Sequence, residues 1–212
     1  MLIKDLEKFA TNIKGEILFD FEIKKFNWFN IGGKAKVFFK PYSLKELLEF
    51  FKLYSNRGKI FILGSGSNVL FSDQTFQGSI IKLGRNFSNI SMLNDDTIVA
   101  GAATSQKKLS EFAKENNIGG LEFMSCIPGS IGGGIRMNSG CFNNEFKDVL
   151  ISIQTIDYSG QIKTIPANKI SFEYRNSDLP KDIIFLSATF KGFKKNSLDI
   201  QNYMDQLKKK KE

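Results

Sequence analysis

The sequence predicts an α+β protein, and two patterns support this fold class. Residues 35–40 and 59–63 have the character of short strands on either side of an amphipathic helix, an arrangement typical of a β-α-β unit. From about residue 84 onward, short apolar stretches alternate with turn signals, as they do in antiparallel sheets. The change of pattern predicts two subdomains, of which the first covers residues 1–83.

Within the first subdomain, the helix signals are the clearest. Residues 2–13 carry apolar side chains at helical spacing, and Gly15 is a candidate for the residue that ends this helix. Ser43 and Glu46 match a capping box, in which the serine oxygen accepts from an early N–H and the glutamate reaches back to the cap. Further strands are expected at residues 19–23 and 79–83.

The second subdomain is expected over residues 84–193, mainly as antiparallel strands with one helix that Ser105 caps. Its strands are expected at residues 90–92, 97–100, 150–157, 162–165 and 183–190. Residues 194–212 are polar and rich in lysine, so we expect a tail or linker there.

The composition excludes several classes of site. Histidine is absent, which removes the usual general base, the usual zinc ligand and every Ser-His or Cys-His nucleophile pair. Cys126 and Cys141 lack Cys-x-x-Cys spacing and are interpreted as reduced, packed thiols. We therefore expect no metal site.

Charge and hydropathy point to a cytoplasmic protein that binds small molecules. The net charge is +8, but the lysines are scattered and cluster only at residues 208–211, which favours a solvated tail over a nucleic-acid surface. No apolar run approaches the roughly 18 residues of a membrane span, and the N-terminus lacks the apolar region of a signal peptide. We expect no nucleic-acid or membrane partner, whereas an anionic small ligand would be attracted.

Two segments rich in glycine and serine are the strongest candidates for a binding site. Residues 125–134, followed by 138–140, hold glycines too dense for a helix, since each costs about 1 kcal/mol there relative to alanine. Free N–H groups on such a loop form an anion site. We also expect a positive φ at Gly129 and a Ser130 hydroxyl that donates to a phosphate. The other segment, residues 64–68, follows the second parallel strand at its carboxyl end, where open α/β sheets place ligands. Together they predict a cofactor that carries phosphate.

Each candidate also has a plain structural alternative. Gly64 and Gly66 are followed by Val69 where a dinucleotide fingerprint needs a third glycine, so this segment could be a simple strand-to-turn connection. The run at residues 129–134 could be a surface loop, although flanking isoleucines indicate partial burial. Arg175 could be an exposed charge on a turn, or it could hold a carboxylate or a developing enolate.

Four motifs in order carry a resemblance to a known family. They are W-F-N-I-G-G (28–33), I-L-G-S-G-S-N-V-L (62–70), I-P-G-S-I-G-G-G-I-R-M-N-S-G (127–140) and F-E-Y-R-N-S (172–177). The chain closely resembles the UDP-N-acetylenolpyruvoylglucosamine reductases, flavoenzymes of peptidoglycan precursor synthesis. The resemblance implies the FAD-binding fold of the vanillyl-alcohol-oxidase type, with two α+β subdomains around the flavin, and a role in cell-wall formation, cell shape and cell division.

The resemblance also assigns residues. The FAD contacts it implies are Gly64, Ser65, Gly66, Ser67, Asn68, Ile127, Pro128, Gly129, Ser130, Gly132, Gly133, Asn138 and Gly140. Arg175 is implied as the catalytic arginine that binds the enolpyruvyl carboxylate of a nucleotide-sugar substrate, with Tyr174 beside it. NADPH would reduce FAD, and the flavin would then pass hydride to the enolpyruvyl double bond.

The family's third domain, with its proton-donating serine and catalytic glutamate, has no counterpart within residues 1–212. We therefore expect a truncated member with impaired turnover, whether by natural truncation, frameshift or a cloning boundary. Asn27 is a lesser departure, since the family often has threonine there. Two alternatives to a flavoenzyme stay open: a non-catalytic flavin-binding or partner-binding module, and a basic nucleic-acid binder that uses the lysine tail.

Overall fold

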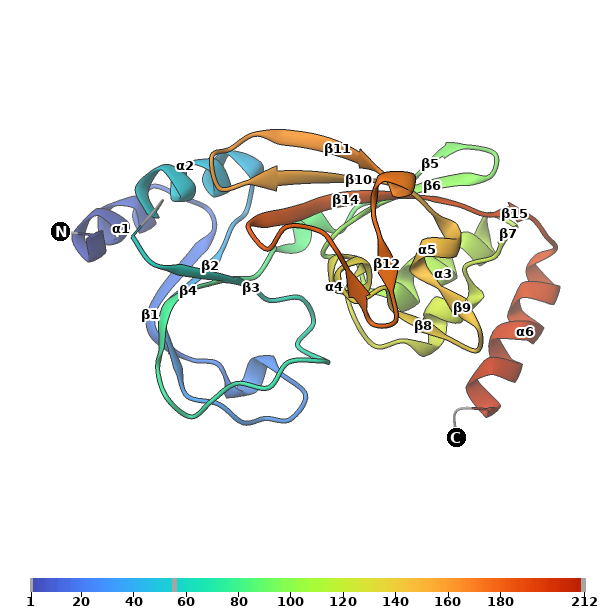
Figure 1. Ribbon diagram of the computed structural model, residues 1–212, viewed down its shortest axis with the longest axis horizontal. Helices are drawn as coiled ribbons and strands as arrows, with labels where there is room; N and C mark the ends of the chain where they lie inside the picture. The colour runs from blue at the N-terminus through green and yellow to red at the C-terminus, as the bar shows by residue number, and fades with distance from the viewer. Residues whose placement is uncertain (1, 55–56, 211–212) are drawn as a thin grey trace. The chain divides into compact units, whose positions relative to one another are not determined.

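The computed structural model describes residues 2–54 and 57–210 (Figure 1). The chain divides into two compact units. One consists of Met1–Phe87 with Ile156–Gln161, and the other of Ser88–Thr155 with Ile162–Glu212. The boundary expected after residue 83 thus falls after Phe87, and one turn of the second half of the chain joins the first unit.

The first unit contains a four-stranded sheet in the order β1-β2-β4-β3 (Figure 1). The pairs β2–β4 and β3–β4 are parallel, whereas β1 pairs with β2 in the antiparallel sense. The predicted β-α-β unit is therefore present, with a third parallel strand between its two strands. The elements are α1 (Leu2–Ala10), β1 (Glu16–Glu22), a 3₁₀ turn (Lys24–Phe26), β2 (Lys34–Lys40), α2 (Leu44–Tyr54), β3 (Lys59–Ile62), β4 (Phe76–Ile81) and a 3₁₀ turn (Arg85–Phe87).

Helix α2 packs its apolar face on this sheet through aromatic rings. Phe50 is fully buried, and its ring stacks on that of Phe39 in β2 with centroids 4.4 Å apart. Leu47 and Phe51 are buried on the same face of the helix. Burial of each such side chain stabilises the unit by roughly 1.5–3 kcal/mol, so α2 is held mainly by this packing.

Glu46 connects the start of α2 to the preceding chain. Ser43 Oγ accepts from the backbone N–H of Glu46 at 3.3 Å, which is the first half of the predicted capping box. The Glu46 carboxylate accepts instead from the backbone N–H groups of Lys14, Gly15 and Tyr42, at 2.9, 3.2 and 2.7 Å. A Cβ on Gly15 would lie 2.6 Å from Glu46 Oε2, so this glycine permits close approach and does not end α1.

The second unit contains a five-stranded sheet in the order β11-β10-β14-β6-β5 (Figure 1). Strand β14 pairs with β6, and β6 with β5, in the antiparallel sense that the sequence predicts. Its strands are β5 (Ile90–Asn94), β6 (Thr97–Gly101), β7 (Ile118–Gly119), β8 (Gly140–Cys141), β9 (Asn144–Glu145), β10 (Leu150–Asp157), β11 (Ile162–Pro166), β12 (Phe172–Glu173), β13 (Asn176–Ser177), β14 (Ile183–Lys191) and β15 (Phe193–Lys194). Its helices are α3 (Gln106–Glu115), α4 (Ile131–Arg136), α5 (Phe146–Val149), α6 (Ser197–Lys209) and the 3₁₀ helices Glu122–Cys126 and Ala167–Lys169.

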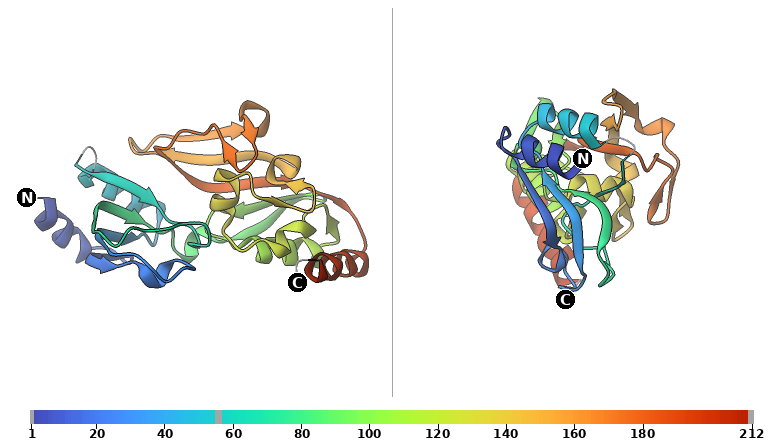
Figure 2. Two further views of the ribbon diagram at one scale, coloured as in Figure 1. Left: turned by 60° about the horizontal axis from the view of Figure 1, so that its bottom comes forward. Right: turned by 90° about the vertical axis from the view of Figure 1, so that its left-hand side faces the viewer.

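The expectation of a polar tail over residues 194–212 is wrong for the part of it that the structure describes. Helix α6 buries Ile200, Met204 and Leu207, which recur at helical spacing on one face. It packs near α3, where Lys114 Nζ donates to Gln201 Oε1 at 2.8 Å (Figure 2). The pattern was overlooked because mostly polar residues separate the three apolar ones and lysines flank the segment at residues 194–195 and 208–211. Among the described residues, no helix is long and apolar enough to cross a membrane.

The glycine run at residues 132–134 is helical, which also corrects the sequence analysis. Ser130 caps α4, and its Oγ accepts from the N–H of Gly133 at 3.2 Å. A Cβ on Gly134 would lie 2.3 Å from the ring of Phe146, so only glycine lets α4 approach α5 this closely. Close packing thus outweighs the low helix propensity of glycine.

We expect Glu46→Ala to lower the free energy of unfolding by about 2–3 kcal/mol, because it leaves N–H groups without their charged acceptor. Glu49→Ala is the matched control, since Glu49 lies on the same helix in a long, exposed pair with Lys45 at 3.9 Å. Urea unfolding followed by circular dichroism measures both. Equal stabilities of the two variants would contradict the anchoring role of Glu46.

Adjacent glycines of α4 should respond differently to alanine. Gly134→Ala should lower the free energy of unfolding of the second unit by about 2 kcal/mol or more, through overpacking against Phe146. Gly133→Ala meets only the flexible Ser130 Oγ, at 3.3 Å, and should be neutral or stabilising, because alanine favours the helix. Thermal unfolding of the two variants measures their stabilities. A Gly133→Ala variant less stable than Gly134→Ala would refute the packing argument.

Candidate functional site

The first predicted segment, residues 64–68, forms the loop after β3 and packs on a turn of its own unit. Gly66 has φ +71°, and a Cβ there would lie 2.0 Å from the carbonyl oxygen of Phe26. The N–H of Trp28 donates to the Gly66 carbonyl at 3.1 Å. The requirement for glycine at this position therefore comes from the protein itself, while Ser65 and Asn68 are exposed on the loop.

Lys82 adds a cation beside this loop that the sequence analysis did not single out. Its Nζ donates to the carbonyl oxygen of Gly64. Burial, together with the positive charge of Lys40, lowers the pKa of the Lys82 amine below its ordinary value. The signal available in the sequence was its place directly after the apolar stretch of β4, since residues at the carboxyl ends of parallel strands gather at one edge.

A buried amide also adjoins the loop. Asn27 is 4% exposed, and its Nδ2 donates to the carbonyl of Ile31 at 2.8 Å, but its Oδ1 has no partner within the described residues. The Cα of Asn27 would lie 2.9 Å from a Cβ on Gly66. A buried acceptor without a partner is uncommon and often marks a ligand or water site.

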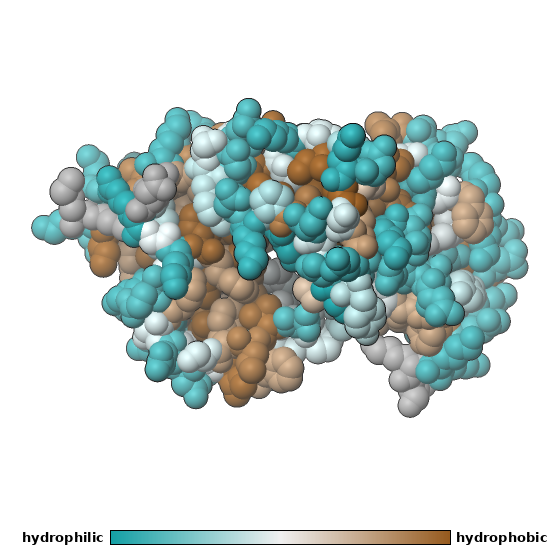
Figure 3. Space-filling view, viewed as in Figure 1, coloured by the Kyte–Doolittle hydropathy of each residue, from teal (hydrophilic) through white to brown (hydrophobic). Residues whose placement is uncertain are grey.

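Apolar side chains are exposed around the same loop. Trp28, Phe29, Ile31 and Leu70 are 62%, 60%, 47% and 69% exposed. Figure 3 shows hydrophobic residues gathering over the loops that follow β1 and β3. Such a surface beside polar donors is typical of binding sites.

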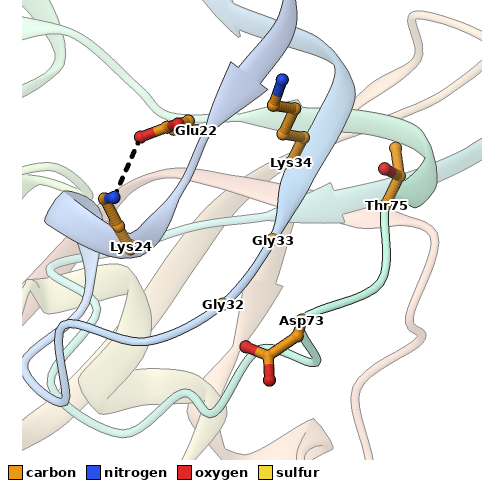
Figure 4. Close-up of a pocket in the computed structure, with 7 residues that line it drawn as sticks. All are labelled: Glu22, Lys24, Gly32, Gly33, Lys34, Asp73 and Thr75. Atoms are coloured by element: carbon orange, nitrogen blue, oxygen red, sulfur yellow. Dashed lines mark ion pairs between the residues drawn. The ribbon is translucent and has the colours of Figure 1, made fainter.

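A shallow pocket of about 370 Å³ lies elsewhere in the first unit (Figure 4). Glu22, Lys24, Gly32, Gly33, Lys34, Asp73 and Thr75 line it. Lys24 pairs with Glu22 at 3.3 Å, and both side chains are at least half exposed. None of the predicted site residues lines this pocket, so it does not extend the candidate site.

The second predicted segment does not form the expected row of free N–H groups. The N–H groups of Ile131, Gly132 and Gly133 donate to Thr104 O, Ala102 O and Ser130 Oγ, at 2.8, 2.9 and 3.2 Å. Gly129 is not among the residues with positive φ, contrary to the prediction. The physical reason for both corrections is that the chain around Ser130 lies along residues 102–106, with an antiparallel bridge between Ser105 and Ser130. Carbonyl groups there and Ser130 Oγ take up these donors, and the Gly129 carbonyl accepts from Gln106 without a turn of positive φ.

Polar atoms beside this segment do lack protein partners. Thr104 Oγ1 and Gln106 Oε1 are buried and unpaired within the part of the chain that the structure describes. Gln106 donates from its backbone N–H to Gly129 O at 3.0 Å and from Nε2 to Ser130 O at 3.4 Å. These two atoms therefore lie next to the predicted cofactor residues, as Asn27 Oδ1 does in the first unit.

Arg175 lies at the tip of the hairpin β12–β13, close to another predicted residue. Its guanidinium donates to the carbonyl oxygen of Gly140 at 3.1 Å, and its Cζ lies 5.6 Å from the ring centroid of Tyr174. The side chain is exposed, and its φ of +56° is uncommon for a residue with a side chain. The structure thus brings Arg175 and its neighbour Tyr174 together with Gly140, which lies 35 residues earlier in the sequence.

Asn138 was predicted to contact the cofactor, but its side-chain amide is engaged within the protein. Nδ2 donates to Glu145 Oε2 at 3.0 Å and to Glu173 O at 3.2 Å, and Oδ1 accepts from the N–H of Lys147 at 3.1 Å. Asn138 is 1% exposed. Glu145 and Lys147, which form an ion pair at 2.7 Å, were not identified from the sequence.

The cysteines and acidic residues add no further candidate. Cys126 and Cys141 are reduced thiols, and Cys141 Sγ donates to Phe123 O at 3.3 Å. Within the described residues, no cluster of three or more histidine, cysteine, aspartate or glutamate side chains could hold a metal ion.

The pKa of Glu145 predicts a pH dependence of stability. The hydrogen bond from Lys147 is the largest effect, and it holds the pKa of this carboxyl below its ordinary value of 4.5. Burial opposes it as the second effect in size, while the hydrogen bond from Asn138 and the charges of Lys147 and Arg175 lower the pKa further. The ionised form therefore stabilises the fold above the unfolded-state pKa, and this stabilisation is lost as pH falls through the lower folded-state pKa.

Between about pH 6 and about pH 3, the wild type should thus lose more unfolding free energy than Glu145→Gln does. Urea unfolding at a series of pH values measures the two slopes, with Glu115→Gln as a control at an exposed position of α3. Parallel pH profiles for the wild type and Glu145→Gln would contradict the assignment.

Known proteins share both the sequence and the fold. The family of FAD binding domains matches residues 35–166. The UDP-N-acetylenolpyruvoylglucosamine reductase of Pelagibacter ubique (strain HTCC1062) is 58% identical over 212 residues, which are 100% of this chain and 70% of that protein. The protein of the same name from Rickettsia bellii (strain RML369-C) is 41% identical over 195 residues, which are 92% of this chain and 65% of that protein.

The crystal structure of UDP-N-acetylenolpyruvylglucosamine reductase from Thermus caldophilus has a TM-score of 0.80 at 23% identity, covering 93% of this chain and 69% of that one. This likeness confirms the predicted FAD-binding fold. Together with the Pelagibacter sequence, it shows that the chain belongs to the UDP-N-acetylenolpyruvoylglucosamine reductase family of FAD-dependent oxidoreductases.

Proposed function

We propose that this chain holds FAD and part of the substrate site of an NADPH-dependent reductase that converts UDP-N-acetylglucosamine enolpyruvate to UDP-N-acetylmuramate. The reaction would take place in the cytoplasm, in the synthesis of peptidoglycan precursors. The observation that carries the proposal is the contact of Arg175 with Gly140 at 3.1 Å, because it joins the motif with the family's arginine to the predicted flavin-lining segment.

The residues present fit FAD in their hydrogen-bonding chemistry, since they offer both acceptors and donors. Of the buried polar atoms without a partner in the described residues, Asn27 Oδ1, Thr104 Oγ1 and Gln106 Oε1 adjoin the two predicted segments. Ser65, Ser67 and Asn68 would offer side-chain donors to a diphosphate, and Lys82 would add positive charge. FAD, when bound, supplies the ring that takes hydride from NADPH and passes it to the substrate.

Arg175 would bind the carboxylate of the enolpyruvyl group. Its guanidinium is exposed and only partly engaged by the Gly140 carbonyl, so N–H groups remain to form a bidentate pair with a carboxylate. The same charge would stabilise the negative charge that develops when hydride adds to the conjugated double bond. Tyr174, 83% exposed beside it, would contact the substrate.

A second candidate function is an FAD-binding module without turnover of its own. It is favoured by one observation: the family that matches residues 35–166 is described by its binding of FAD alone. Turnover of NADPH with the enolpyruvyl substrate separates the two candidates, since only the reductase would consume both.

FAD binding can be tested with the tryptophan that the chain already carries. Trp28 is the single tryptophan, and its backbone N–H donates a hydrogen bond to the Gly66 carbonyl. Because this places it beside the predicted FAD-binding loop, its fluorescence should be quenched when a flavin binds. Thr104→Val should keep or raise stability, because the hydroxyl it removes has no partner among residues 2–54 and 57–210, yet it should weaken FAD binding by about five-fold. Arg175→Lys should leave FAD affinity unchanged. A wild-type chain that neither carries nor takes up FAD would refute the proposal.

A further inference from the structure

We propose that Asn138 and Glu145 are positioning residues for Arg175, which hold its hairpin tip and its Gly140 contact in one fixed arrangement. The inference rests on the proposed role of Arg175 in binding the substrate carboxylate. It assigns to Asn138 a role other than the cofactor contact that the sequence predicted.

The first link runs from Asn138 to the hairpin. Asn138 Nδ2 donates to Glu173 O at 3.2 Å, and Glu173 is the last residue of β12, two positions before Arg175. Asn138 itself has φ +39°, a conformation that asparagine tolerates better than most residues. It is almost fully buried, so its bonds are protected from competition with water.

The second link runs from Glu145 to the acceptor of Arg175. Glu145 pairs with Gly140 across β8 and β9, and a Cβ on Gly140 would lie 2.8 Å from Glu145 Cγ. The Oε2 atom of Glu145 accepts from Asn138 Nδ2 at 3.0 Å and from Lys147 Nζ at 2.7 Å. The Glu145 side chain thus binds Asn138 through its carboxylate and packs closely against Gly140 through its Cγ.

These contacts close a ring around the hairpin tip. Its members are Arg175, Gly140, Glu145, Asn138 and Glu173, each joined to the next by a hydrogen bond, a strand pairing or the chain. Arg175 has φ +56°, a sparsely populated state that persists only where its surroundings hold it. The ring supplies that restraint at the tip.

Separate contacts hold the base of the hairpin, which makes the proposal testable in a folded protein. Arg136 donates to Leu179 O at 2.7 Å and to Pro180 O at 2.9 Å, and Ser177 Oγ donates to Arg136 O at 3.1 Å. None of these bonds involves Asn138. A change at Asn138 should therefore loosen the tip while the base of the hairpin stays attached to α4.

The decisive variant is Asn138→Asp, which removes the Nδ2 donor and keeps an oxygen for the Lys147 N–H. In the FAD-loaded chain, we expect FAD affinity to change less than about two-fold and the Kd for UDP-N-acetylglucosamine enolpyruvate to rise about ten-fold, the cost of one hydrogen bond to a charged group. Flavin fluorescence measures the first, and the absorbance change of the flavin on adding substrate measures the second. Amide hydrogen exchange should accelerate at residues 173–176 and remain unchanged in β14.

Asn116→Asp is the matched control, since Asn116 Nδ2 also donates to a backbone carbonyl, Phe112 O, at 2.8 Å, but in α3. Glu145→Gln should keep most of the wild-type substrate affinity, because a glutamine oxygen still accepts from Asn138. Glu145→Ala removes this acceptor and should therefore raise the substrate Kd as Asn138→Asp does. A purely structural role would instead lower FAD affinity and substrate affinity together.

The inference is overturned if Asn138→Asp matches Asn116→Asp in substrate Kd and in exchange at residues 173–176. If the wild type binds FAD but not the substrate, the proposed role of Arg175 fails. Hydrogen exchange then still decides whether Asn138 and Glu145 hold the hairpin tip, because that measurement needs no ligand.

Discussion

The close packing of Gly134 on the ring of Phe146 is the contact on which the candidate site of the second unit depends. It lets α4 lie directly against α5, and the residues that end α4 are then fixed in place. Arg136 and Asn138 follow within one turn, and both bind the segment that carries Arg175. A side chain at residue 134 would displace the helix, and the hairpin would lose both of its attachments at once.

Three glycines of the predicted site or beside it permit close packing within the protein itself. Gly66, Gly134 and Gly140 would each place a Cβ within 2.4 Å of another atom of the chain. The indications of a ligand lie instead in the neighbouring polar atoms, Asn27 Oδ1, Thr104 Oγ1 and Gln106 Oε1, which are buried without a partner in the described residues. Glycine-rich segments thus shape the backbone, and side chains close by supply the unsatisfied hydrogen-bonding capacity.

Strand positions and the parallel unit of the first half were predictable because alternation and apolar runs are local signals. Strand β10 begins and ends where the pattern placed it, and Ser105 caps α3 as expected. Helix α4 was missed because propensity disfavours three glycines, while the compensating contact with Phe146 is tertiary and invisible in one sequence. Helix α6 was missed for a different reason. Its three buried apolar residues are separated mainly by polar ones, and they form a continuous face only when the segment is helical.

Within the site, the motifs identified Arg175 and Gly140, but the polar contacts that connect them could not be inferred. Glu145 and Lys147 belong to none of the segments by which the family was recognised, and their importance follows from the pairing of β8 with β9. Asn138 lies in a motif, yet its bonds are internal. On the proposal made above, Asn138 belongs to the motif because it supports the position of Arg175.

A site without histidine needs groups whose charges stay constant around neutral pH, and this arrangement has them. Arginine remains protonated, and the hydrogen bond from Lys147 keeps the pKa of Glu145 below its ordinary value, so both charges persist throughout the neutral range. Asn138 between them is uncharged and links the two parts by geometry alone. The hairpin tip consequently presents one fixed cation, and its function depends on where that cation is held rather than on whether it is charged.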